Sequence, residues 1–203
     1  MRRLGYVRSS KAPSAFQEDD VDAAIACGDR LRAFSLLMTR YGDQVYRYAL
    51  AVLSDPVQAE EVRQQAFVEA YRDLPRFAGR SPVRVWLLKI VRNRCLDSVK
   101  ATKRWGARFK NEVAAEPELE EPGPGDQLDR ARVASVLVDC LSTLAPAARE
   151  AVLLRYQQEL SYDEAAAIIG DRSGTLQQRV ARALPVLRKC IEARLRAGGR
   201  DDV

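Results

Sequence analysis

The chain contains no histidine among its 203 residues. Its four cysteines stand far apart in the sequence, and no two of them form a Cys-x-x-Cys pair; they are Cys27, Cys95, Cys140 and Cys190. The sequence therefore predicts neither a zinc site nor a disulfide framework. Without histidine the chain also lacks the commonest general base and most nucleophilic triads. Because a Gly-rich phosphate loop is missing too, we expect no catalytic site, metal or cofactor.

Long apolar runs are equally lacking. No stretch approaches the roughly 18 residues that a membrane-spanning helix needs. The N-terminus has two early arginines but not the apolar segment of a secretory signal, so we expect a cytoplasmic protein. Few segments alternate as strands do, whereas long stretches are rich in Ala, Leu, Arg and Glu. This composition predicts an all-α fold.

Charge is distributed unevenly along the chain, whose net charge is +5. Residues 111–129 hold seven acids and no base. Without these seven of the 28 acids, 33 basic residues face 21 acidic ones, a balance of +12. A basic protein with an acidic insert indicates a polyanionic partner.

The same acidic segment divides the chain. Residues 111–127 are rich in Pro and Gly and are expected to form a flexible linker. It joins two small helical domains, 21–110 and 128–197, of which the second ends in a helix-turn-helix. Residues 1–20 read as a disordered basic arm, either an untethered tail or a contact with nucleic acid. Residues 198–203 form a tail.

The most basic stretch is 84–110, with nine Lys or Arg residues, one acid and both tryptophans of the chain. On a helix, its apolar residues gather on one side: Leu87, Leu88, Val91, Cys95 and Val99. Another side carries Trp86, Lys89, Asn93 and Lys100. Cations and an aromatic ring on one surface suit nucleic acid, where they hold phosphates and stack on opened bases. The alternative is a solvated basic face with Trp86 folded back onto a neighbouring helix.

Upstream of this stretch the sequence predicts helix boundaries from local signals. Gly28 and Asp29 interrupt one helical pattern, and Asp55 or Ser54 caps the next helix, with Pro56 in its first turn. In that helix Phe67 points inward together with Val62, Ala66, Ala70, Tyr71 and Leu74, while Glu60, Glu61, Gln64, Gln65 and Glu69 point outward. Residues 75–82 form a loop with an exposed Phe77.

The end of the second domain has the pattern of a helix-turn-helix. Ser161 and Glu164 form a capping box, and Gly170 closes the short helix that they begin. A second helix starts near Gly174, with Leu176, Val180 and Leu184 as its buried stripe. Its outer face holds residue types that reach phosphates and base edges: Thr175, Gln178, Arg179 and Arg182. The alternative is a plain helical hairpin with a polar outer face.

Taken together, these residues resemble the extracytoplasmic-function (ECF) sigma factors of bacterial RNA polymerase. The resemblance covers 34–104 and 141–195, in the family's order. Its most specific part is the Trp-Leu-x-x-Ile-x-x-Asn run of Trp86, Leu87, Ile90 and Asn93, followed by Asp97. LSTLAPAAREAVLLRY and LSYDEAAAIIG carry the second half.

The resemblance implies a non-catalytic specificity subunit whose partners are core RNA polymerase, promoter DNA and an anti-sigma factor. The helix 60–71 would dock on the largest polymerase subunit through Glu60, Glu61, Gln64, Gln65 and Phe67. The −10 element would be recognised and melted by Phe77, Arg80, Ser81, Arg84, Trp86, Lys89, Asn93 and Lys100. The second domain would touch the second-largest subunit and bind the −35 element through Arg172, Ser173, Thr175, Gln178, Arg179 and Arg182.

The second domain departs from the family pattern in three places. Asp171 stands where an apolar residue usually packs the turn, and Gln177 and Gln178 follow Leu176 where the family has a cation and a serine. Pro185 falls inside the second helix, where we expect a kink or a stop. We therefore expect altered or weak −35 recognition. Two further functions remain open: a sigma-like DNA-binding regulator that does not open promoters, and an interaction protein that mainly grips a protein partner.

Overall fold

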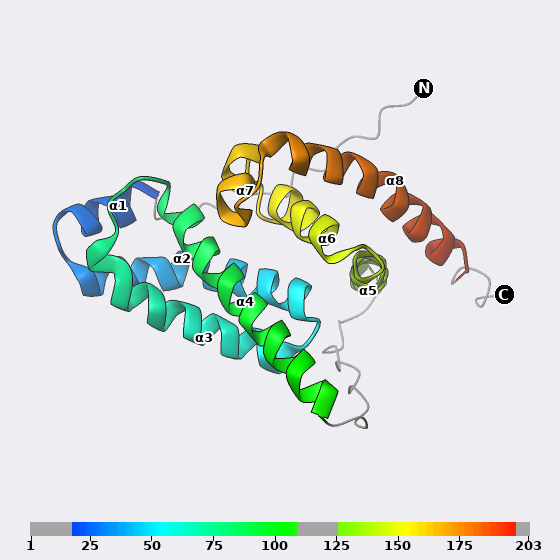
Figure 1. Cartoon of the computed structure of the whole chain (residues 1–203), viewed down its shortest axis with the longest axis horizontal. Helices are drawn as coiled ribbons and strands as arrows, with labels where there is room; N and C mark the ends of the chain where they lie inside the picture. The colour runs from blue at the N-terminus through cyan, green and yellow to red at the C-terminus, as the bar shows by residue number, and fades with distance from the viewer. Residues whose placement is uncertain (1–17, 109–125, 198–203) are drawn as a thin grey trace.

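The computed structural model describes residues 18–108 and 126–197, and within these ranges every regular element is helical, as predicted (Figure 1). The elements in chain order are α1 (Glu18–Ala26), α2 (Arg30–Leu53), α3 (Pro56–Asp73), the 3₁₀ turn η1 (Leu74–Arg76), α4 (Val83–Arg108), α5 (Asp126–Ser142), α6 (Pro146–Val152), the π-helical turn η2 (Leu153–Gln157), α7 (Tyr162–Ile169) and α8 (Ser173–Ala197). None of the described helices is long and apolar enough to cross a membrane.

Two helix starts in the first domain fall at the predicted boundaries, and Asp29, predicted only as a break, turns out to be a cap. Asp29 caps α2 by accepting a hydrogen bond from the Arg32 backbone N–H. Asp55 caps α3 by accepting from the N–H groups of Val57 and Gln58, and Pro56 follows it as the first helical residue. The backbone N–H bond from Gln58 is the main reason why the pKa of the Asp55 carboxyl is lowered.

Helices α1 to α4 enclose the core of the first domain. Most of the predicted apolar side of α4 is buried, with Leu87, Leu88, Val91 and Cys95 each at most 2% exposed, while Val99 is half-buried. The pKa of the Cys95 thiol is raised to about 12, first by burial and second by the negative charge of Glu150. Burial confirms that Cys95 packs in the core, and the raised pKa of its thiol disfavours the reactive thiolate.

The second domain comprises α5 to α8. Its predicted capping box is present, because the Ser161 and Glu164 side chains each accept a bond from the other's backbone N–H. Gly170 ends α7 at a φ of +80°, a left-handed conformation in which a residue with a Cβ would be strained. These two signals hold α7 and α8 in the expected helix-turn-helix.

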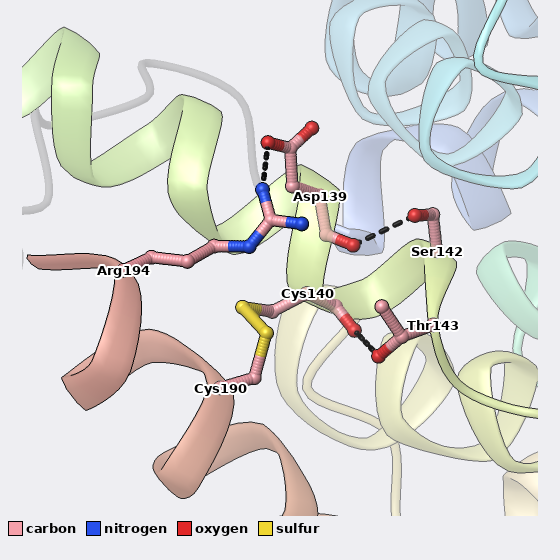
Figure 2. Close-up of a disulfide and its surroundings, with 6 residues drawn as sticks. All are labelled: Asp139, Cys140, Ser142, Thr143, Cys190 and Arg194. Carbon is pink, nitrogen blue, oxygen red and sulfur yellow. Dashed lines mark hydrogen bonds and ion pairs between the residues drawn. A yellow bond between two sulfur atoms is a disulfide. The ribbon is translucent and has the colours of Figure 1, made fainter. Parts of the chain in front are cut away.

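The cysteine prediction was wrong. Cys140 on α5 and Cys190 on α8 form a disulfide, although 50 positions separate them in the sequence (Figure 2). The bridge exists because α5 packs along α8 and brings the two Cα atoms within 5.8 Å. An ion pair between Asp139 and Arg194 joins the same two helices beside it.

The prediction for α8 needs a correction at Leu184, and at Pro185 the helix does not stop. Leu184 is 39% exposed, and the buried stripe instead runs through Leu176, Val180, Ala183 and Leu187. At about 100° per residue, a residue eight positions further along points about 80° away from the first one around the helix axis. A residue seven positions further along points only about 20° away. The helix also continues through Pro185 to Ala197. Ala181, whose carbonyl loses its N–H partner at Pro185, is exposed like the proline itself, so water can satisfy that carbonyl.

Several predicted segments fall outside the described residues. They are most of the N-terminal arm (1–17), nearly all of the acidic linker (109–125) and the tail (198–203). The side chain of Trp105 lies outside them as well. Helix α1 begins at Glu18 and α5 at Asp126, each two or three residues before the predicted domain starts.

Candidate nucleic-acid interface

The first candidate surface begins where the 77–82 loop enters α4. The Pro82 carbonyl accepts bonds from the N–H groups of Val85 and Trp86, which fixes the first turn of the helix. The rings of Phe77 and Trp86 then pack together, with centroids 5.1 Å apart and planes inclined by 49°. Both rings are half-buried against the core, so Phe77 is less exposed than the sequence predicted.

Beyond this aromatic pair, three polar residues of α4 are exposed: Lys89, Asn93 and Lys100. At about 100° per residue they lie within about 60° of Trp86 around the helix axis, on one side. Arg80 is exposed and Ser81 half-buried in the loop before the helix. The structure therefore brings a pair of aromatic rings, an amide and several cations together on one surface.

The cations of α4 are less available than the sequence suggests. Arg92 forms an ion pair with Glu150, with 2.5 Å between Nε and Oε1, and Arg84 lies 3.7 Å from Glu164. Both acids belong to the second domain, so no local pattern in α4 could reveal them. Two further ion pairs lie within the first domain and neutralise two more cations: Arg94 with Glu69 at 2.8 Å and Lys100 with Asp97 at 3.7 Å. Among the described residues, Lys89 has no acid within 4 Å.

The second candidate surface is the outer face of the helix-turn-helix. Arg172, Gln178 and Arg182 are exposed, and Ser173 and Thr175 are half-buried. Arg179 is held by Asp171, with Nη2 and Oδ2 2.7 Å apart.

Asp171 also accepts a bond of 2.7 Å from the Arg172 backbone N–H. That bond, followed by the charge of Arg179, lowers the pKa of the Asp171 carboxyl. The carboxylate therefore stands at the start of α8 beside a cation predicted to contact DNA. A helix start of this kind otherwise favours a phosphate.

The third candidate surface is the exposed side of α3. Glu61, Gln64 and Gln65 are exposed, while Glu60 is partly occupied by a two-bond ion pair with Arg63 at 2.6 and 2.7 Å. Phe67 is only 5% exposed and packs edge-on against Phe34, so its ring is not available to a partner in this conformation. The burial confirms that Phe67 points inward, and its assignment to the docking surface stays a prediction.

Two valines of α3 that the sequence did not single out are exposed. Val57 is 78% exposed and Val68 is 70% exposed. With Glu61 and Gln64 they follow the spacing i, i+4, i+7, i+11, which places all four on one stripe of the helix. The sequence alone could have predicted this exposure, because the two valines share the helical spacing of polar residues that were predicted to point outward. We call Val57, Glu61, Gln64 and Val68 the α3 stripe.

Comparisons with known proteins match each of the two domains to a region of sigma-70 proteins. The family described as sigma-70 region 2 matches residues 37–105, and the family described as sigma-70 region 4 matches residues 135–184. The ECF RNA polymerase sigma factor SigC of Mycobacterium tuberculosis is 35% identical over 160 residues, which are 77% of this chain and 82% of that protein. The chain belongs to the ECF family of RNA polymerase sigma factors.

Other relatives of this ECF sigma factor agree. The RNA polymerase sigma-E factor of Streptomyces avermitilis is 31% identical over 170 residues, which cover 84% of this chain and 90% of that one. Among solved structures, the sigma factor RpoE of Bartonella quintana in complex with the anti-sigma factor NepR matches with a TM-score of 0.63 at 26% identity, over 78% of this chain and 96% of that one. The structure of CnrH in complex with the cytosolic domain of CnrY matches with a TM-score of 0.61 at 26% identity, over 86% of this chain and 99% of that one.

The matched regions contain all three candidate surfaces of this ECF sigma factor. The region 2 match includes α3, the 77–82 loop and most of α4, and the region 4 match ends within α8 at residue 184, beyond the outer-face residues. Among the described residues, no group of three or more Cys, Asp or Glu gathers in a way that would hold a metal ion.

Proposed function

We propose that this sigma factor opens promoter DNA with the 77–82 loop and the exposed side of α4. The observation that carries the proposal is the Phe77–Trp86 ring pair at 5.1 Å, followed by exposed Lys89 and Asn93 on the same side of α4. The residues assigned to the −10 element are Phe77, Arg80, Ser81, Arg84, Trp86, Lys89, Asn93 and Lys100.

The chemistry of strand opening fits that combination. Extruding a base from a duplex costs a few kcal/mol, and stacking one base on an aromatic side chain returns about 1–3 kcal/mol. The Phe77–Trp86 pair offers an aromatic surface on the same side of α4 as the Asn93 amide, which can donate to or accept from a base edge. Arg80 and Lys89 supply charge for the neighbouring phosphates.

The α3 stripe is the proposed docking surface for core polymerase. Its centre is polar and acidic, while exposed Val57 and Val68 flank it. A duplex would repel the acids, whereas a basic protein surface with apolar pockets would accept both kinds of side chain. Gln65 and Glu60 border the stripe and are assigned to the same contact.

We assign the −35 element to the outer face of the helix-turn-helix, with weakened phosphate contacts. Gln178 can read an adenine edge, and Arg172 and Arg182 are exposed. Arg179 is neutralised by Asp171 in the free protein. This ion pair is also the observation that favours a second candidate function, a sigma-like DNA-binding regulator that does not open promoters.

Two further assignments complete the proposal. The factor acts as a specificity subunit without catalytic activity of its own, in the cytoplasm where core polymerase works. An anti-sigma factor is a proposed partner, because two structures that match over most of both chains are sigma factors bound to such proteins.

Transcription in vitro tests the proposal. Core polymerase freed of other sigma factors is mixed with this protein and a library of genomic fragments, and the transcript starts are sequenced. Starts that share a −10 motif support the proposed function, whereas DNA binding without transcripts would support the regulator. A Val57→Asp and Val68→Asp double variant is expected to lose holoenzyme assembly, while Leu31→Asp, on an equally exposed residue of α2, serves as the matched control.

A further inference from the structure

The disulfide between Cys140 and Cys190 joins α5 to the end of α8 in the second domain (Figure 2). Cys140 is 0% exposed, whereas Cys190 is half-buried against the core. The sigma-70 region 4 match covers residues 135–184, so it includes Cys140 and ends before Cys190. The bridge therefore fixes a part of α8 that lies beyond the matched region.

Packing alone holds the first part of α5 weakly. Every side chain from residue 133 to 139 is exposed except that of Val136, which is half-buried. The last turn of the helix is held by buried Leu141 and Leu144. The part of α5 that precedes Cys140 therefore depends on the bridge for its contact with α8.

The end of α8 is held just as weakly. Among the side chains described from residue 185 to 196, only Leu187 is buried, and Cys190 and Ile191 are half-buried. Pro185 also removes one backbone hydrogen bond at the start of this part of the helix. A helix segment with one buried residue after a proline needs a further tie to stay in place.

The ion pair beside the bridge cannot supply that tie. Its partners, Asp139 and Arg194, are 53% and 45% exposed, and exposed pairs contribute little to stability. A disulfide that closes a separation of 50 residues contributes far more, because it restricts the unfolded chain. Breaking the S–S bond should loosen the end of α8, while Leu176, Val180 and Ala183 keep its first half in the core.

The cytoplasmic location proposed above bears directly on this bond. Thiol pools of the cytoplasm keep most cysteines reduced, and the disulfides found there are usually transient or redox-sensing. Half-buried Cys190 offers its sulfur to an attacking thiolate, whereas Cys140 is shielded. The two remaining cysteines, Cys27 and Cys95, are free and belong to the first domain.

We propose that the Cys140–Cys190 disulfide is a redox switch that sets the strength of DNA binding by the second domain. The inference rests on the proposed function, since it needs the cytoplasmic location and the DNA-binding role of α8. With the bridge formed, α5 and the end of α8 are one rigid unit. With the bridge broken, α8 loses its tie beyond Pro185, three residues after Arg182, which is assigned to DNA.

A dithiol reductant of the cytoplasm carries out the reduction. One of its thiolates attacks Sγ of Cys190, the S–S bond breaks, and Cys140 leaves as a thiolate that takes up a proton. The second thiol of the reductant then displaces Cys190, which leaves as a thiolate and takes up a proton as well. Two electrons and two protons thus pass to the protein, and the reductant leaves as a disulfide. A disulfide oxidant runs the same exchange in reverse.

DNA binding by the full-length protein in its two redox states tests the switch. The protein is equilibrated with reduced or with oxidised glutathione, and fluorescence anisotropy with a labelled nonspecific duplex measures its affinity. Reduction lowers the fraction of the protein in which α8 is intact, and the affinity falls in proportion to that fraction. We expect the reduced form to bind at least about threefold more weakly than the oxidised form. Alkylation of acid-quenched samples counts the free thiols in each state.

Two serine variants assign the effect to the bridge. Cys190→Ser changes the half-buried partner, and it should bind DNA as the reduced wild type does, in both buffers. Cys27→Ser is the matched control, because Cys27 is exposed and not bridged; it should respond to glutathione as the wild type does. Circular dichroism of each sample checks that the overall helical content is retained.

The same thiols can be followed inside cells that produce the full chain. The cells are acid-quenched and alkylated before and after treatment with diamide, which oxidises thiols. We expect Cys140 and Cys190 to be free before the treatment and bridged after it.

The outcomes separate the switch from the proposed function. The switch is wrong if the bridge persists in untreated cells, if the thiols stay free after diamide, or if the two redox states bind DNA equally. A bridge that forms and breaks as expected, with the expected change in affinity, supports it. Should the holoenzyme then yield no transcripts with a common start motif, the proposed function fails while the switch stands.

Discussion

Asp171→Asn offers a quantitative test of the second DNA-binding surface. In the structure the Asp171 carboxylate lies 2.7 Å from the Arg179 guanidinium and occupies the start of α8. The amide of asparagine keeps the size of the side chain and can still accept from the Arg172 backbone N–H. It no longer neutralises Arg179, so we expect that cation to become available to a DNA phosphate.

The size of the effect follows from counterion release. Each phosphate neutralised by a protein cation adds about 0.9 to the slope of log K against log salt. One additional contact therefore makes the variant lose about 3.5-fold more affinity than the wild type when salt rises from about 50 to 200 mM. At the lower salt concentration the variant should bind the duplex more tightly than the wild type.

Fluorescence anisotropy with a labelled nonspecific duplex measures the affinity at low salt and its decrease with salt, using the whole chain. Asp163→Asn is the matched control, because Asp163 is an exposed acid of α7 and its removal changes the net charge equally. The double variant Asp171→Asn with Arg179→Gln should lose the added slope. The reasoning is refuted if Asp171→Asn binds more weakly than the wild type, which would mean that Asp171 orients Arg179 for DNA contact instead of withholding it.

Three further changes test the fold. Replacing Cys140 and Cys190 by serine should lower the free energy of unfolding by about 4 kcal/mol, because the disulfide closes a sequence separation of 50 residues. Urea unfolding in oxidising buffer measures this loss, and equal midpoints for the variant and the wild type would contradict it. Asp55→Ala should cost about 1 kcal/mol through loss of the α3 cap. Since the pKa of Asp55 is lowered by folding, its contribution is present above about pH 4 and should disappear as the pH falls through the folded pKa. Leu187→Ala should cost about 2–5 kcal/mol, whereas Leu184→Ala, at 39% exposure, should cost less than about 1 kcal/mol.

The features that the sequence predicted well are those set by neighbouring residues. The cap at Asp55, the capping box of Ser161 and Glu164 and the left-handed Gly170 each depend on groups within four positions. The buried side of α4 also followed from residue spacing alone. Such signals are physical consequences of one helical turn, and a single sequence contains them in full.

The features that the sequence missed depend on how distant helices meet. Cys140 and Cys190 become partners only through the packing of α5 on α8. In the sequence Arg92 has no nearby acid that would predict its ion pair, because its partner Glu150 belongs to the second domain. The error at Leu184 differs in kind, since a stripe extended by four and four positions drifts around the helix and one extended by four and three does not.

Strand opening measured directly is the best test of whether the exposed side of α4 opens the promoter. A duplex from the promoters found by transcript sequencing carries 2-aminopurine in its −10 element, and its fluorescence reports unstacking when holoenzyme is added. Lys89→Ala with Asn93→Ala changes two exposed residues, so the fold should be kept, and Trp86→Ala is added as a third change. We expect opening to fall at least about tenfold, from the loss of stacking and base contacts, while assembly with core polymerase is unchanged. Wild-type opening by the triple variant would contradict the claim.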